Sequence, residues 1–267
     1  MEQKIDGITR SSIMIEATRV HEDKTEVGSA VMSGFLWKHK DESFVITNWH
    51  NVTGINPDTN EYIGSFTPNQ FTITIKYHLP SETKGLNDVM GGKRKLNLYE
   101  NDDKHIWLEH PKGKAVDVVA IPIDLKLPDK AIISYINDQD YELNWLPDVG
   151  DECFIIGHPE GFSGPLETPV WKRGSVATLP LLDYDNKPVF LVDTIGNKGL
   201  SGAAVIGRGK GIFDSNPGKR LSPDAIFGSW SNFIGVYAGR ISKTGIGSQL
   251  GRVWKKSVID EIFKHNT

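Results

Sequence analysis

Hydrophobic and polar positions follow the two-residue period of a β-strand over most of the chain. In residues 71–78 the odd positions are apolar and the even positions are polar, which predicts a strand with one buried face. Shorter apolar or β-branched runs, most of them bounded by Gly, Pro, Asn or Asp, raise the number to about six strands in each half. These further predicted strands span residues 13–20, 29–37, 44–47, 96–99, 116–123, 152–157, 169–179, 189–194, 202–207, 233–238 and 244–247.

The C-terminal region is the only one with a convincing helical period. Its apolar residues recur at three- or four-residue spacing, with charged residues between them. This spacing predicts one helix over residues 248–265 that packs its apolar face against the body of the protein. The residues of this face are Leu250, Val253, Trp254, Val258, Ile262 and Phe263.

A polar connection over residues 124–147 separates the two strand-rich halves. We therefore predict an N-terminal β unit over residues 8–125 and a C-terminal β unit over residues 146–247. Six strands in each half could close as two small antiparallel barrels, which would place functional residues in the loops at their junction. Strand counting alone does not distinguish two barrels from two sandwiches. Long polar stretches predict surface loops at 54–69, 79–94 and 208–231.

Composition narrows the class of protein. The 267 residues include one cysteine, Cys153, so no intrachain disulfide can form and a disulfide-rich secreted scaffold is excluded. A net charge of −4 does not support general binding to nucleic acid. No apolar window approaches the length of about 18 residues that a membrane helix needs, and the polar N-terminus does not resemble a signal peptide. We expect a cytoplasmic protein with no membrane partner.

Three short segments carry residues that can perform chemistry together. His50 ends an apolar strand, Asp117 interrupts an apolar run, and Ser201 lies on a glycine-flanked turn. Each residue alone is most simply structural. Together they fit one mechanism, because a buried carboxylate needs a donor and a His ring N–H supplies it. The other ring nitrogen can then take the proton of a hydroxyl nucleophile.

The glycines beside Ser201 fit the same chemistry. An acyl-transfer site must stabilise a developing oxyanion, and backbone N–H groups do this where the chain turns sharply. We expect the amides of Gly199 and Ser201 to form this oxyanion hole, and Gly202 to allow close approach of the substrate. Three other histidines, His105, His110 and His158, lack metal-ligand spacing, so no metal is expected.

The order of these segments resembles the chymotrypsin-fold (trypsin-like) serine peptidases, above all their disulfide-free bacterial members, such as HtrA-like and stand-alone trypsin-like peptidases. Residues 47–50, Thr-Asn-Trp-His, are similar to the family's Thr-Ala-Ala-His. Residues 117–121 are similar to its Asp-Ile-Ala-Leu-Leu, and residues 199–203 to its Gly-Asp/Asn-Ser-Gly-Gly. The resemblance implies an all-β fold of two six-stranded antiparallel barrels with a C-terminal helix. The triad of His50, Asp117 and Ser201 would lie between the barrels.

Substrate-binding residues follow from the same resemblance. Residues 235–239 look like the strand that holds the substrate, which places Tyr237, Ala238, Gly239 and Arg240 beside the peptide. Ile195 occupies the position that reads the side chain before the cleaved bond, so a small or apolar side chain is expected there. Arg240 could instead favour an acidic residue.

Three further residues qualify the resemblance. Lys198 could assist binding or remain solvated. Leu200 stands where digestive members carry Asp, so their activation by a new N-terminus is not expected. Ala203 replaces the family's second glycine after the serine.

The sequence therefore predicts a serine endopeptidase without metal or cofactor. It would act on a protein or peptide substrate and form an acyl-enzyme. A dedicated protein target or an activating partner is possible for such a stand-alone peptidase. The alternative is a protein-binding module of the same fold with a non-functional triad.

Overall fold

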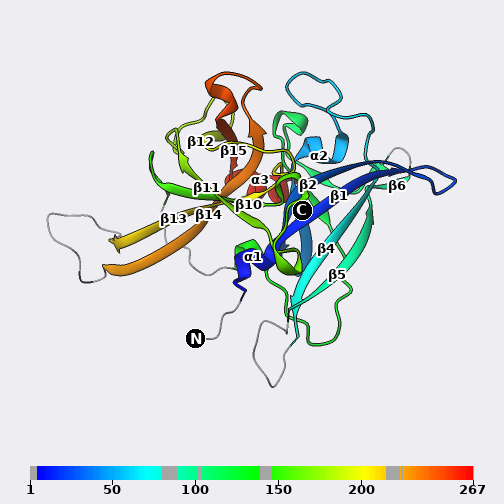
Figure 1. The fold of residues 1–267 in the computed structure, drawn as a ribbon, viewed down its shortest axis with the longest axis horizontal. Helices are drawn as coiled ribbons and strands as arrows, with labels where there is room; N and C mark the ends of the chain where they lie inside the picture. Colours follow the sequence, from blue (N-terminus) through cyan, green and yellow to red (C-terminus); the bar gives the residue numbers. More distant parts are fainter. Residues whose placement is uncertain are drawn as a thin grey trace.

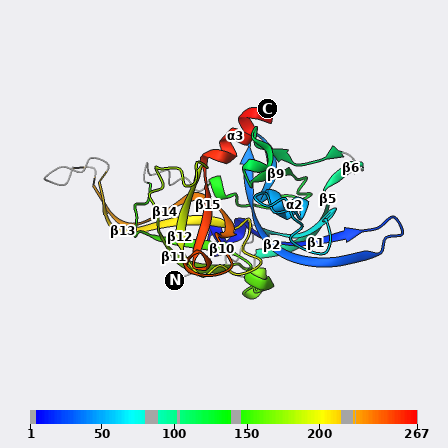
Figure 2. The ribbon, with the colours of Figure 1, turned by 90° about the horizontal axis from the view of Figure 1, so that it is seen from above.

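The computed structural model describes residues 5–79, 89–101, 104–138, 146–214, 223 and 225–266. All strand pairs in this part of the chain are antiparallel, and the strands form two β units side by side (Figures 1 and 2). The loops predicted at 79–94 and 208–231 lie partly outside the described residues, as does the end of the predicted connection at 124–147. The predicted all-β fold is confirmed.

The N-terminal unit is a seven-stranded sheet with the order β5-β4-β1-β2-β3-β9-β8. Its strands are β1 (Ser12–Val20), β2 (Glu26–His39), β3 (Glu42–Thr47), β4 (Gln70–His78), β5 (Val89–Asn97), β8 (Leu108–Glu109) and β9 (Val119–Pro122). A separate two-stranded sheet pairs β6 (Tyr99–Asn101) with β7 (Lys104–His105). The sequence predicted a closed six-stranded barrel here, so both the strand number and the closure differ. Most of β5 lies in the stretch that we predicted to be a loop. Gly91, Gly92 and three basic residues give this segment a low intrinsic preference for a strand. It nevertheless forms a strand, because it pairs residue by residue with β4.

The C-terminal unit is a closed six-stranded barrel with the order β10-β11-β12-β15-β14-β13. Its strands are β10 (Glu152–Gly157), β11 (Val170–Val176), β12 (Val189–Asp193), β13 (Ala204–Phe213), β14 (Ile226–Arg240) and β15 (Leu250–Lys255). The hairpin of β13 and β14 projects far from the barrel, and the hairpin of β1 and β2 projects on the opposite side (Figure 2).

Two predictions at the end of the chain are wrong. Residues 244–247 form no strand, and the first half of the predicted helix is strand β15, so helix α3 spans only Ser257–Asn266. The reason lies in the burial of β15 on both faces. Val253 packs inside the barrel, whereas Trp254 packs outside it against the rest of the protein. A strand buried on both sides loses its alternation and mimics the helical period.

The two units share one hydrophobic core. Phe35 and Ile46 of the N-terminal sheet pack in the same cluster as Ile156 and Ile206 of the barrel. Helix α3 follows the barrel in sequence but lies over the junction, where Phe263 stacks on His39 (Figure 2). This shared core packs the two units directly against each other. No helix within the described residues is both long and apolar enough to cross a membrane.

Candidate active site

His50 lies at the start of a short helix that follows strand β3. Helix α2 (Trp49–Thr53) begins after Asn48, whose backbone is extended, and ends at Gly54, which adopts a left-handed conformation with φ of 70°. The strand before it is fully buried at its end, so α2 is anchored at the edge of the core. The His50 side chain keeps 13% of its surface exposed.

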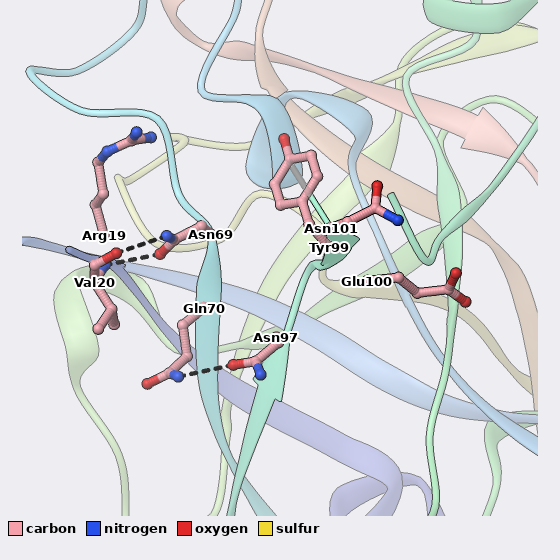
Figure 3. Close-up of a pocket in the computed structure, with 8 residues that line it drawn as sticks. All are labelled: Arg19, Val20, Asn69, Gln70, Asn97, Tyr99, Glu100 and Asn101. Atoms are coloured by element: carbon pink, nitrogen blue, oxygen red, sulfur yellow. Dashed lines mark hydrogen bonds between the residues drawn. The ribbon is translucent and has the colours of Figure 1, made fainter. Parts of the chain in front are cut away.

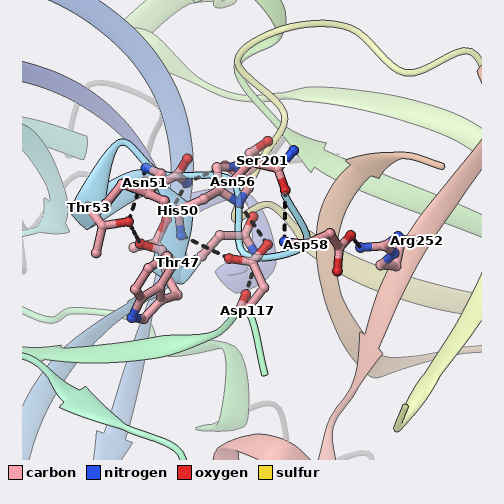
Figure 4. A network of polar contacts seen from close by, with 12 residues as sticks. Thr47, His50, Asn51, Thr53, Asn56, Asp58, Asp117, Ser201 and Arg252 are labelled. Atoms are coloured by element: carbon pink, nitrogen blue, oxygen red, sulfur yellow. Dashed lines mark hydrogen bonds and ion pairs between the residues drawn. The ribbon is translucent and has the colours of Figure 1, made fainter. Parts of the chain in front are cut away.

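Asp117 holds His50 through both carboxylate oxygens. Its Oδ2 lies 2.7 Å from His50 Nδ1, and its Oδ1 accepts the backbone N–H of His50 at 2.9 Å (Figure 4). Asn48 donates its side-chain amide to the Asp117 carbonyl at 2.7 Å. Asp117 is only 2% exposed, so these donors replace the water that it lost. Because a carboxylate only accepts, Nδ1 carries the ring proton and Nε2 is left as a base.

Ser201 lies on a turn that the N-terminal unit holds in place. The Ser201 carbonyl accepts the backbone N–H of Ser33 at 2.9 Å and the side-chain amide of Asn51 at 3.1 Å. Gly202, with φ of 84°, lets this contact form, because a Cβ there would overlap the Ser33 carbonyl and Thr47 Oγ1. The Ser33 hydroxyl also donates to the Gly199 carbonyl at 2.7 Å. The serine turn is therefore positioned by strand β2, through Ser33, and by helix α2, which carries both Asn51 and His50.

A cleft of about 330 Å³ brings the three residues together. His50, Asp117 and Ser201 all line it. The Ser201 hydroxyl forms no hydrogen bond with any described residue, and none joins it to the His50 ring. The hydroxyl is therefore free toward the cleft, and a hydrogen bond to His50 Nε2 would have to form by rotation of the serine or on substrate binding.

Two backbone amides of the serine turn are unused. The Lys198 carbonyl accepts Glu160 N–H at 2.7 Å, and the Leu200 carbonyl accepts Ala203 N–H at 3.0 Å. In a trans peptide the N–H points opposite to the carbonyl, so these bonds fix the directions of the N–H groups of Gly199 and Ser201. Neither N–H donates to a described residue. Gly199 adopts φ of 87°, which the predicted turn requires of a glycine.

The predicted substrate-binding residues are mostly, but not all, at the cleft. The lining includes Lys198, Tyr237, Ala238, Gly239 and Arg240. Gly239 is close to the serine, since a Cβ at this position would lie 3.9 Å from Ser201 Oγ. Ile195 is 66% exposed and does not line the cleft, so the structure does not bring it to the other site residues.

One wall of the cleft was not predicted residue by residue. It comes from the loop after α2, through Asn56, Pro57, Asp58 and Ile63. The Asp58 carboxylate crosses to the barrel, where it binds Lys187 at 2.6 Å and Arg252 at 2.8 Å (Figure 4). Burial raises the pKa of Asp58, but its hydrogen bonds and ion pairs with these two cations outweigh burial and hold the pKa below its usual value. The only sequence signal for this wall was a long polar loop.

Other ionisable residues, buried away from the cleft, have structural roles. Desolvation, with the charge of Lys76 nearby, lowers the pKa of buried His158 to about 3, so its ring is neutral. Burial raises the pKa of Cys153 to about 12, which leaves it an unreactive thiol. No cluster of three or more metal-ligating side chains occurs in the described part of the chain.

A second pocket, of about 460 Å³, lies on the N-terminal sheet. It shares no lining residue with the cleft that contains Ser201. Its amide side chains are bound to the protein itself: Asn69 pairs with the backbone of Val20, and Gln70 donates to Asn97 (Figure 3). It holds no arrangement of nucleophile and base. The candidate active site is therefore the smaller cleft.

Comparison with known proteins supports the fold. No model of a known protein family matches the sequence, and no curated protein matches it. The structure is similar to that of an HtrA-type protease, AlgW, with a tripeptide: the TM-score is 0.52 and the identity 14%, over 96% of this chain and 60% of that one. It is also similar to AL20, a thermostable serine protease from an extremophilic microorganism, with a TM-score of 0.47 and 11% identity over 98% of both chains.

The first of these similarities establishes the fold and no more. This chain has the fold of the chymotrypsin-like, HtrA-type serine proteases, and it spans about 60% of the length of the HtrA-type protease. The chemistry of the cleft must be argued from its own residues.

Proposed function

We propose that this protein is a serine endopeptidase that hydrolyses peptide bonds through an acyl-enzyme. The observation that carries the proposal is the Asp117–His50 pair. The carboxylate accepts the ring N–H of His50 at 2.7 Å and its backbone N–H at 2.9 Å, in a cleft that also contains a free serine hydroxyl. A merely structural aspartate would not need to fix the tautomer of a histidine that lines the same cleft as a serine.

The first half of the reaction forms the acyl-enzyme. As Ser201 Oγ bonds to the carbonyl carbon of the substrate, its proton passes to His50 Nε2, and the carbonyl oxygen becomes an oxyanion. Asp117 stabilises the imidazolium that results. The N–H groups of Gly199 and Ser201, which have no acceptor within the described chain, bind the oxyanion.

The second half returns the enzyme to its starting state. The C–N bond breaks as His50 Nε2 gives its proton to the leaving amine. Water then bonds to the acyl carbon and passes its proton to His50, and the bond to Ser201 Oγ breaks as the oxygen regains a proton. Every proton transfer uses one ring nitrogen, which explains why Nδ1 has to remain bonded to Asp117 throughout.

Labelling with a fluorophosphonate probe tests the proposal directly. Wild-type protein should label covalently and cleave members of a peptide library, whereas Ser201→Ala should do neither. Equal behaviour of the two proteins would refute the proposal. Thermal unfolding of both proteins should agree, because Ser201 Oγ holds no structural hydrogen bond.

A second candidate function is a protein-binding module with an idle triad. The observation in its favour is that no hydrogen bond joins Ser201 to His50. A binding module would bind peptides in the cleft without labelling or turnover, and His50→Ala would leave that binding intact.

We further propose that the peptidase acts in a bacterial cytoplasm on one dedicated protein target, with control by a partner. Support comes from the free, unreactive Cys153 and from the buried Leu200, which offers no carboxylate to an activating N-terminus. Comparison of the proteomes of cells that carry wild type or Ser201→Ala would identify one cleaved protein or many.

A further inference from the structure

The cleft around Ser201 carries cationic side chains without an ionic partner. Lys198, Arg240 and Lys243 line it, and none of them forms an ion pair with another described residue. Both carboxylates of the lining are already engaged, Asp117 with His50 and Asp58 with Lys187 and Arg252. The cleft is therefore electropositive in a chain of net charge −4. Such a surface attracts acidic segments of a substrate.

Arg240 is the cation best placed to contact the side chain next to the cleaved bond. It follows Gly239, the residue whose Cβ position lies 3.9 Å from Ser201 Oγ. Its alkyl chain packs on Gly196, since a Cβ added there would lie 2.6 Å from Arg240 Cγ. Gly196 belongs to the segment that leads to the serine turn. The stem of Arg240 is thus held across the wall beside the nucleophile. Arg240 is exposed, and its head group forms no hydrogen bond or ion pair with another described residue.

Tyr237 closes the space beneath this wall. Its buried ring lies between Gly196 and Gly251, where a Cβ on either glycine would overlap the ring or its hydroxyl. A large apolar side chain of the substrate cannot enter the volume that the ring already fills. The pocket beside Ser201 therefore has a closed floor and a charged rim, which suits a short side chain that ends in a negative charge.

We infer that the peptidase prefers Asp or Glu immediately before the cleaved bond, with Arg240 as the residue that determines this specificity. The inference rests on the proposed function. The acidic side chain would lie over the Tyr237 floor, and its carboxylate would bind the Arg240 guanidinium. Lys198 and Lys243 would add attraction along the cleft without selecting a position.

The test uses matched peptides that differ only in the residue before the cleaved bond: Glu, Asp, Gln, Leu, Phe or Lys. We expect kcat/KM for Glu to exceed that for its neutral isostere Gln by about tenfold or more, as one charge-assisted hydrogen bond predicts. The ratio should fall as NaCl rises from about 0.05 to 0.5 M, because the head group is exposed to solvent. Arg240→Glu should abolish the preference for Glu and improve cleavage after Lys.

Two controls separate this inference from the proposed function. Lys210→Glu makes the same change of charge on the projecting hairpin, outside the cleft, and should keep the wild-type Glu/Gln ratio. Phosphonate inhibitors that carry Glu or Gln report the preference even where peptide turnover is slow. Labelling by a general fluorophosphonate without faster reaction of the Glu phosphonate would overturn the inference alone. Absence of any labelling would overturn both.

Discussion

Substitution of Asp117 by asparagine tests the chemical logic of the site with little change in shape. The carboxylate accepts from the His50 backbone and ring at 2.9 Å and 2.7 Å. An asparagine can keep its oxygen on the backbone N–H, but its NH₂ group then faces the ring nitrogen Nδ1. That nitrogen must become an acceptor, so the ring proton moves to Nε2. Nε2, once protonated, can no longer accept the serine proton.

The expected loss is large in rate and small in stability. A wrong tautomer in such a triad lowers kcat by about 10⁴, which corresponds to about 5.5 kcal/mol of transition-state stabilisation. In the folded state a neutral hydrogen bond replaces a charge-assisted one. The free energy of unfolding should therefore fall by about 1 kcal/mol.

The assay pairs kinetics with unfolding. We would measure kcat on the best library peptide, and urea unfolding at the same pH, for wild type, Asp117→Asn and Asp41→Asn. Asp41 is an exposed acid of the turn between β2 and β3, and its substitution should leave kcat unchanged. A loss in kcat of less than about tenfold for Asp117→Asn, with the fold intact, would refute the role of Asp117 in fixing the tautomer.

Three other predictions concern the turn, the wall and a buried lysine. Gly202→Ala should abolish activity and lower the melting temperature, because a Cβ would overlap the Ser33 carbonyl at a φ of 84°; an unchanged enzyme would show that the turn can relax. Asp58→Asn should lower the free energy of unfolding by less than about 1 kcal/mol, because the ion pairs of Asp58 are partly solvated. The difference between variant and wild type should vanish as the pH falls through the lowered pKa of Asp58, because wild type then loses the same charge.

Lys76 is 1% exposed, and burial lowers its pKa from 10.5 to about 8. The unfolded chain therefore binds more protons between these values, and the stability of wild type should rise with pH from 8 to 10.5. Urea unfolding of Lys76→Met should show a flatter rise, and identical pH profiles would contradict the assignment.

The sequence was sufficient for the segments that carry the candidate triad, because each lies where an apolar run meets a polar or glycine-rich break. The sequence was not sufficient to predict segments whose structure depends on the neighbouring strand or on the surfaces packed against them. Strand β5 forms because β4 offers it a complete edge, although its own residues favour no strand. Strand β15 is buried on both faces, so its pattern carries no two-residue period.

The same distinction holds within the site. Asp58 reaches Arg252 across 194 positions of the chain, and no local pattern announces such a contact. Ile195 was placed in the cleft by counting back from Ser201, yet it is 66% exposed and does not line the cleft, whereas the neighbouring Gly196 does. Counting along the chain gives a position, but it does not say which of two neighbouring residues lines the cleft.

The hydrogen bonds from Ser33 and Asn51 to the serine turn have a consequence for when the site can form during synthesis of the chain. The ribosome adds His50 and Asp117 to the chain well before it adds Ser201. Contacts from the first unit hold this turn in the folded protein, so its shape depends on that unit lying beside the barrel. A chain that ends before the barrel therefore lacks Ser201, and a barrel without the first unit lacks the contacts from Ser33 and Asn51. On the proposed function, the complete site would form only after both units have been synthesised and packed together.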